Sequence, residues 1–224
     1  MRYDIISANP AIIEGVKDTG LIGRAIRKGH IELFVHNLRD YAEGNYRQID
    51  DVPYGGGAGM VLKPEPFFRC LDKVLSERKY DEIIHFSPQG KVLNQKMIND
   101  FTLKSNLILI CGHYKGIDQR VIDKYATVEI SLGDFVLSSG DIAAIAFIDA
   151  VSRLIPGVLG DGESAMTDSF QNEIIFDAPC YTRPEEYEGM KVPEVLLSGN
   201  HSEIKKWKEL KGIEKYIKSK NKKN

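Results

Sequence analysis

Residues Ser131–Phe170 read SLGDFVLSSGDIAAIAFIDAVSRLIPGVLGDGESAMTDSF, and the organisation of the chain follows from this stretch. It begins with a loop bounded by glycines, Gly133–Gly140, and continues into an almost wholly apolar segment. Polar residues fall in a limited sector of that segment, which predicts a helix over Asp141–Leu154 that lies in the core or in a subunit interface. Pro156 then ends the helix, because proline lacks the amide donor that a further turn needs.

Two charged residues flank the end of this expected helix. Arg153 stands in its last turn, and Asp168 closes the polar run that follows. A carboxylate close to an arginine is a candidate pair for acid–base chemistry. From spacing alone, an ion pair between Arg153 and Asp149, one turn earlier, is the commoner role for such an arginine.

The composition is that of a soluble globular protein. The chain has 224 residues, 42% hydrophobic and 28% charged, which is enough to bury a substantial core. No apolar run approaches the roughly 20 residues of a membrane-spanning helix. The first ten residues have neither the basic nor the long apolar segment of a secretion signal, so we expect a cytoplasmic protein. Cys70, Cys111 and Cys180 have no metal-binding spacing, and we expect all three to be small core residues.

The charge is unevenly distributed. From Lys205 to Asn224 there are nine lysines against two glutamates, although the net charge of the whole chain is −2. A basic terminus on an acidic body can bind a polyanion such as RNA or DNA. A solvated, fraying terminus explains the same charges equally well.

Three consecutive strand-and-loop units predict a parallel sheet. The middle strand is continuously apolar, which is typical of a strand buried on both faces, and helices expected over Gln95–Leu103 and Ile117–Tyr125 supply the crossovers. The fold class is therefore α/β. The three units are Glu82–Phe86 with loop Ser87–Gly90, Asn106–Cys111 with loop Gly112–Gly116, and Thr127–Leu132 with loop Gly133–Leu137. Before them we expect strands at Tyr3–Ser7 and Ile31–Leu38 and helices at Ala11–Lys17, Leu21–Lys28 and Pro64–Arg78.

The three loops predict a ligand cleft. Ligands of open parallel sheets bind at the carboxyl ends of the strands, and loops rich in Gly, Ser and Pro expose backbone donors and acceptors that suit a nucleoside. A further glycine-rich segment, Tyr54–Met60, is either a wide turn or a lid that approaches something closely. No dinucleotide fingerprint follows the first strand, which argues against a dinucleotide oxidoreductase.

The last quarter of the chain differs in composition. Residues 160–169 are rich in Gly, Asp, Glu and Ser and predict an interdomain linker. A final helix is expected over Ser202–Lys218, with Asn200 as its cap and Glu203 in its first turn.

These motifs, in this order, resemble the bacterial tRNA (guanine-N1)-methyltransferases, which belong to the knotted SPOUT class of S-adenosylmethionine-dependent enzymes. The resemblance spans nearly the whole chain. The matching segments are Tyr54–Met60, Ser87–Gly90, Cys111–Gly112, Gly116–Asp118, Gly133–Leu137, Arg153–Leu159, Asp168–Phe170, Tyr181–Pro184, Val192–Pro193 and Leu197–Ile204 with Trp207.

The resemblance implies a domain plan and an assembly. Residues 1–159 would form an α/β domain with a deep trefoil knot, residues 160–172 a flexible linker, and residues 173–224 a small helical domain that binds tRNA. The implied partners are tRNA with guanosine at position 37 and a second copy of the chain, and neither DNA nor a membrane.

The resemblance also implies the site residues. Asp168 would remove the proton from guanine N1 and Arg153 would stabilise the negative charge that develops toward O6, with Asp168 supplied by the partner subunit. The implied cofactor-binding residues are Ser87, Pro88, Gly90, Gly112, Leu132, Gly133, Asp134, Phe135, Val136, Leu137 and Gly140. The implied substrate-binding residues are Gly59, Met60, Ser169, His201, Lys205 and Trp207.

One departure from the family concerns a metal. Relatives commonly carry an acidic residue, implicated around the cofactor's amino group or Mg²⁺, where this chain has Lys115. A cation does not ligate Mg²⁺, so that role is not carried over and no metal ligand is assigned. The alternatives are a SPOUT methyltransferase acting on another RNA nucleotide, against which the Asp168–Phe170 segment argues, and a noncatalytic RNA-binding protein that retains the fold.

Overall fold

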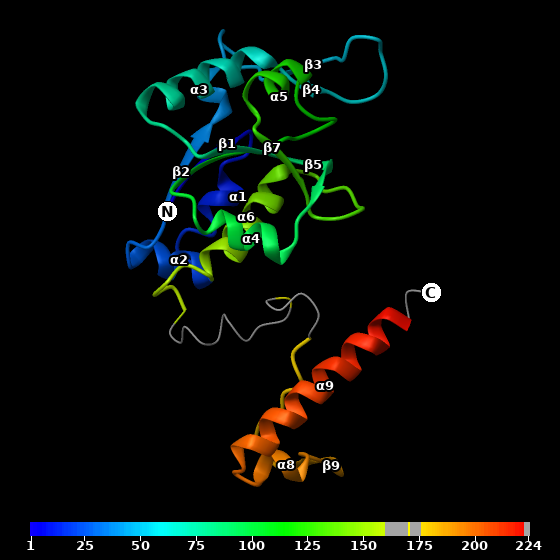
Figure 1. The fold of residues 1–224 in the computed structure, drawn as a ribbon. Coiled ribbons are helices and arrows are strands. Elements are labelled where there is room, and N and C mark those ends of the chain that lie inside the picture. The colour runs from blue at the N-terminus through cyan, green and yellow to red at the C-terminus, as the bar shows by residue number, and fades with distance from the viewer. Residues whose placement is uncertain (160–169, 171–175, 222–224) are drawn as a thin grey trace. The chain divides into compact units, whose positions relative to one another are not determined.

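The computed structural model describes residues 1–159, 170 and 176–221. The chain divides into two compact units, Met1–Gly160 and Asp161–Asn224, and each is described by itself. Figure 1 labels the helices and strands of both units.

A five-stranded sheet forms the centre of the first unit. Its strands are β1 (Arg2–Ser7), β2 (Glu32–Asn37), β5 (Glu82–Val92), β6 (Asn106–Ile110) and β7 (Val128–Ser131). Their order is β2-β1-β6-β5-β7, and every neighbouring pair is parallel. The apolar strand β6 lies in the middle, as its sequence predicts. The expected α/β class with a parallel sheet is confirmed.

Helices cover both faces of the sheet (Figure 1). One face carries α3 (Pro64–Glu77), α5 (Gln119–Tyr125) and the 3-10 turn η1 (Leu38–Tyr41). The other face carries α1 (Ala11–Glu14), α2 (Gly20–Arg27), α4 (Gln95–Phe101) and α6 (Gly140–Ser152). Alternate residues of β6 serve the two cores: Leu107 and Leu109 face α6, whereas Ile108 and Ile110 face α3.

Helix α6 is central to one of these cores. Phe147 on α6 packs edge-on against Phe86 and Phe101, with ring centroids 5.8 Å and 4.9 Å apart. Such edge-to-face contacts add to the hydrophobic gain from burial. The buried helix expected at this position is present, and its described end lies at Ser152.

The structure corrects one element. Residues Ser87–Gly90 were expected to form a loop after a short strand, but β5 continues to Val92 with an irregularity inside it. Phe86 and Lys91 both pair with Ile130 of β7, so the four residues between them leave the ladder as a bulge. The local sequence does not show the bulge, because it is defined by β5 pairing with β7 again at Lys91, on the far side of the four extra residues.

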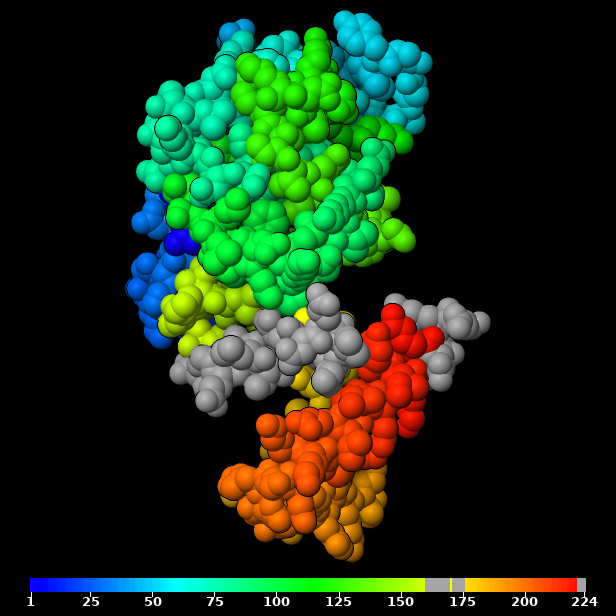
Figure 2. Space-filling model, viewed as in Figure 1, coloured from blue at the N-terminus to red at the C-terminus, as the bar shows by residue number. Residues whose placement is uncertain are grey.

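A short hairpin extends from the first unit. Its strands are β3 (Asp50–Asp51) and β4 (Val61–Leu62), and the glycine-rich segment lies between them. Figures 1 and 2 show this segment, in cyan, reaching out from the body of the unit. The Tyr54 side chain, at the start of this segment, is fully exposed.

The second unit is small and mainly helical in its described part. It contains the hairpin β8 (Glu186–Tyr187) and β9 (Met190–Lys191), the short helix α8 (Glu194–Leu197) and the long helix α9 (His201–Asn221). The side chain of Asn200 accepts a hydrogen bond from the Glu203 amide, which confirms the expected cap. Cys180 is exposed, so its assignment to a core was wrong, whereas Cys70 and Cys111 are buried. No helix in the described ranges is long and apolar enough to span a bilayer.

Candidate active site

A cavity of about 800 Å³ opens where β5, β6 and β7 end. This volume lies within the range of small-molecule sites, and the carboxyl edge of a parallel sheet is where ligands of this fold class bind. The β5 bulge and the loops after β6 and β7, which are the three segments named from the sequence, therefore converge on it. Of the expected cofactor residues, those that line the cavity are Ser87, Pro88, Gly112, Leu132, Phe135, Val136, Leu137 and Gly140. Of the expected substrate residues, Gly59 and Met60 also line it.

The bulge in β5 supplies the first wall. Ser87, Pro88 and Gln89 line the cavity, and the Gln89 amide donates a hydrogen bond to the Ser87 hydroxyl. Gly90 does not line the cavity, but it allows the β5 backbone to pack closely against β7. A Cβ atom there would lie 2.6 Å from the backbone of Glu129 and Ile130 on β7, so only glycine allows β5 to return to the sheet.

Two glycines bring the second loop and helix α6 together. The Gly140 amide donates a 2.8 Å hydrogen bond to the carbonyl of Gly112. A Cβ atom at Gly140 would lie 2.9 Å from the Gly112 nitrogen, so this contact requires glycine. Ser139 caps the helix by accepting a hydrogen bond from the Asp141 amide. The amino-terminal end of α6 is thereby fixed at the cavity.

The third loop contributes apolar surface. Phe135 and Val136 line the cavity while 53% and 83% of their surfaces stay exposed, so both offer apolar surface to a ligand. Gly133 and Asp134 belong to the same loop but are not part of the cavity wall. Gly133 has φ +146°, a conformation that other residues rarely adopt, and shapes the turn before Phe135.

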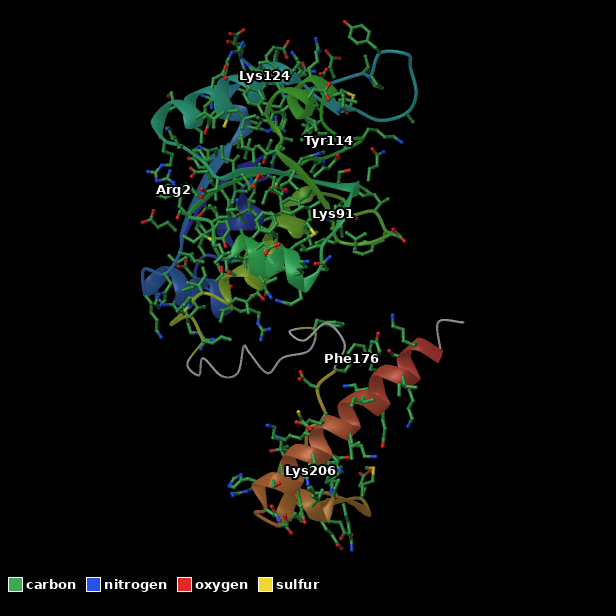
Figure 3. All side chains as sticks on the ribbon, in the orientation of Figure 1. Arg2, Lys91, Tyr114, Lys124, Phe176 and Lys206 are labelled. Carbon is green, nitrogen blue, oxygen red and sulfur yellow. The ribbon has the colours of Figure 1, made fainter. Side chains whose placement is uncertain are left out.

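The glycine-rich segment is bound to the second loop. The Lys115 amide donates a 3.0 Å hydrogen bond to the carbonyl of Met60. The side chain of Lys115 runs beneath Gly59, where a Cβ atom would lie 2.8 Å from Lys115 Cγ. Tyr114, labelled in Figure 3, precedes Lys115 in the left-handed region with φ +58°. Lys115 thus lies in the wall as a cation, and its main chain fixes one end of the segment.

A histidine and a glutamate in the cavity wall were missed in the sequence. His85 on β5 and Glu129 on β7 lie directly opposite each other, with Nδ1 and Oε1 3.2 Å apart. Burial lowers the pKa of His85 and outweighs the opposing effect of Glu129. Nothing in either local sequence marks the pair, because the two residues meet only through strand register.

Arg153 lies away from this cavity. It caps the carboxyl end of α6, is half-buried, and does not belong to the cavity wall. Because a helix rises about 1.5 Å per residue, Arg153 stands roughly 20 Å from Gly140 along the helix. Asp168 and Ser169 lie outside the described residues.

The remaining expected substrate residues belong to the second unit. His201, Lys205 and Trp207 all lie on the first two turns of α9. Trp207 is half-buried and packs against Tyr181, with ring centroids 6.3 Å apart, whereas His201 and Lys205 are exposed. Lysines recur along the exposed surface of the same helix, which suits contact with a polyanion.

Within the described ranges, no three His, Cys, Asp or Glu side chains gather in a way that could hold a metal ion. The cavity wall offers hydrogen-bond donors and acceptors from backbone amides and carbonyls, from hydroxyl groups and from the side chains of His85, Gln89 and Glu129, together with apolar side chains. Such a wall fits a nucleoside whose edge is read by paired donors and acceptors and whose ring is covered by Phe135 and its neighbours.

Comparison with known proteins gives consistent matches. The sequence model of the family described as tRNA (Guanine-1)-methyltransferase TrmD matches residues 1–222. The tRNA (guanine-N(1)-)-methyltransferase of Chlorobaculum tepidum is 55% identical over 93% of this chain and 90% of that protein. The protein of the same name from Bacteroides fragilis is 50% identical over 96% of this chain and 95% of that protein. The crystal structure of tRNA (m1G37) methyltransferase from Aquifex aeolicus superposes with a TM-score of 0.81 at 42% identity, covering 99% of this chain and 93% of that one.

Proposed function

The chain belongs to the tRNA (guanine-1)-methyltransferase family, and we infer that it methylates N1 of guanosine-37 in tRNA with S-adenosylmethionine as the donor. The products are N1-methylguanosine and S-adenosylhomocysteine. The observation that supports this function is the convergence of the β5 bulge and two small-residue loops on one cavity at the carboxyl edge of the sheet.

The cavity suits the donor. Backbone groups of the loops after β6 and β7 offer donors and acceptors to its adenine edge, while Phe135 and Val136 offer apolar surface to its ring. When bound, S-adenosylmethionine supplies a methyl group activated by a sulfonium. The chain therefore needs no nucleophile of its own, and its task is to bind, orient and deprotonate the guanine.

Asp168 and Arg153 are proposed to perform that task. Guanine N1 carries a proton at neutral pH, and a carboxylate at N1 can accept it as the methyl group arrives. Negative charge then develops toward O6, where a guanidinium stabilises it. Mg²⁺ is given no role at Lys115, because an ammonium group repels a cation.

We further propose that the enzyme is a homodimer in which these two residues come from different chains. The resemblance to the family supports this arrangement, with Asp168, carried by the segment after α6, as the residue that the partner supplies. An isologous dimer then builds two identical sites, each with residues from both chains.

The domain plan stays part of the proposal. Residues 1–159 would carry a deep trefoil knot and the donor site, residues 160–172 would act as a linker, and residues 173–224 would bind tRNA. The recurring lysines of α9 support the last assignment, because each can neutralise a phosphate. A cytoplasmic location follows from the substrate.

The decisive experiment uses labelled S-adenosylmethionine and two tRNAs that differ only in carrying G or A at position 37. We expect label in the G37 tRNA alone. Asp168→Asn should abolish transfer while leaving donor binding intact. No transfer to the G37 tRNA would refute the function, and equal transfer to both tRNAs would move the target to another nucleotide.

A further inference from the structure

The His85–Glu129 pair has no part in the chemistry described above, although both residues line the cavity. Parallel pairing of β5 and β7 sets them opposite each other, on the strands rather than on the loops. The Glu129 side chain is 37% exposed, and that of His85 is 11% exposed. The pairing of two strands therefore holds a carboxylate at the cavity wall.

The pair carries one net negative charge. His85 Nδ1 is buried and, within the described ranges, has no well-formed hydrogen bond despite its 3.2 Å approach to Glu129. Burial lowers the pKa of His85, so the imidazole is neutral near neutral pH. The charge of Glu129 is consequently not cancelled by its neighbour.

Among the residues that the structure describes, Glu129 is the only acidic side chain in the cavity wall. Besides His85, the other ionisable groups there are Lys115, His113 and Tyr114, all from the loop after β6. Lys115 is held beneath Gly59 on the glycine-rich segment. Glu129 therefore supplies the negative side-chain charge of the described wall.

We propose that Glu129 recognises the positive charge of the methyl donor and so distinguishes the donor from the spent product. This rests on the proposed function. The sulfonium of S-adenosylmethionine carries a positive charge, whereas the thioether left after methyl transfer carries none, and the rest of the two molecules is identical. A carboxylate in a partly enclosed cavity acts on that charge more strongly than in water. Glu129 thereby favours donor binding and product release.

The test measures binding to the full-length protein by calorimetry, with three ligands. They are S-adenosylmethionine, S-adenosylhomocysteine, and sinefungin, in which a protonated amine replaces the sulfonium group. Glu129→Gln should weaken binding of both cationic ligands about tenfold and that of the neutral product less than twofold. Glu129→Asp should restore part of the difference. Asp100→Asn, an exposed α4 residue outside the cavity wall, is the control for overall charge and should change none of the three affinities.

Two results would overturn the proposal. An equal loss for all three ligands would mean that Glu129 binds a part they share, and no change for any would mean that the pair is structural only. Should Glu129→Gln fail to fold, Glu129→Met supplies a second uncharged side chain of similar length. If the unaltered protein bound none of the three, the proposed function itself would fall, which is a separate result.

Discussion

Replacing Asp4 by asparagine tests whether a buried carboxylate stabilises the first unit. Asp4 is fully buried on β1 and accepts hydrogen bonds from three side chains. Arg2 donates through Nε at 2.6 Å and Nη2 at 2.9 Å, His36 Nε2 lies 2.8 Å away, and the Tyr80 hydroxyl donates at 2.8 Å. Arg2, labelled in Figure 3, also stacks on Phe34.

The magnitude follows from the pKa of Asp4. Burial alone would raise this pKa, but the hydrogen bonds from His36, Arg2 and Tyr80 outweigh burial and lower it from 3.8 to about 2. A carboxylate with a lowered pKa in the folded state stabilises that state at every pH above its unfolded value. The contribution is about 2 kcal/mol, and it is lost as the pH falls from about 4 toward 2.

The assay is urea unfolding followed by circular dichroism, at pH 7 and in steps down to pH 3. Asp4→Asn should cost about 2 kcal/mol at pH 7, and its deficit should shrink as the pH falls. The control is Asp40→Asn, which removes an ion pair with Arg47 whose side chains are about 60% exposed, and it should change the unfolding free energy by less than about 1 kcal/mol. An Asp4→Asn protein as stable as the unaltered one, or a deficit that does not depend on pH, would refute the reasoning.

Three further outcomes are expected. Gly90→Ala should lower the unfolding free energy by roughly 1–3 kcal/mol and weaken donor binding in calorimetry, because the Cβ of the alanine would meet the β7 backbone at 2.6 Å. Gly15→Ala is the control and should be nearly neutral, because a Cβ there makes only ordinary contacts. Mixing inactive Arg153→Ala and Asp168→Ala chains should restore about a quarter of the active sites in a methylation assay. Half of the dimers become mixed, and each mixed dimer has one intact site out of two. No restoration would place both residues in one chain. Replacing lysines of α9 by glutamine should weaken tRNA binding. The slope of the logarithm of the binding constant against the logarithm of the salt concentration should flatten by about one unit for each phosphate that is no longer neutralised. An unchanged slope would mean that α9 does not contact the RNA.

The sequence predicted those parts of the fold that depend on local pattern. The continuous apolar run of β6 and the apolar helix α6 were both found where expected, because hydrophobic periodicity alone specifies them. The small-residue segments of the cavity wall were found because Gly, Ser and Pro interrupt strands, although the first of them is a bulge inside β5 and not a loop after it. The resemblance to a known family then named the function that these loops serve.

The features that the sequence did not predict depend on how strands β5 and β7 pair with each other. The bulge at Ser87–Gly90 exists because β7 pairs with β5 on both sides of it, and the His85–Glu129 pair joins residues more than forty positions apart in the chain. Neither has a local signature. Cys180 was misassigned because burial was inferred from residue type, whereas the second unit has few elements in its described part that could cover it.

Helix α6 fixes one half of the proposed shared site. Its amino-terminal end is held at the cavity by the Gly140–Gly112 hydrogen bond, and its buried residues fill the core beneath the sheet. A helix held along its length in this way fixes the position of Arg153 relative to the core of its own chain. Asp168 follows the helix in the sequence and, in the proposed dimer, acts in the site of the partner. The mixed-chain assay tests this arrangement directly, because activity returns only if the Arg153 and Asp168 of one site belong to different chains.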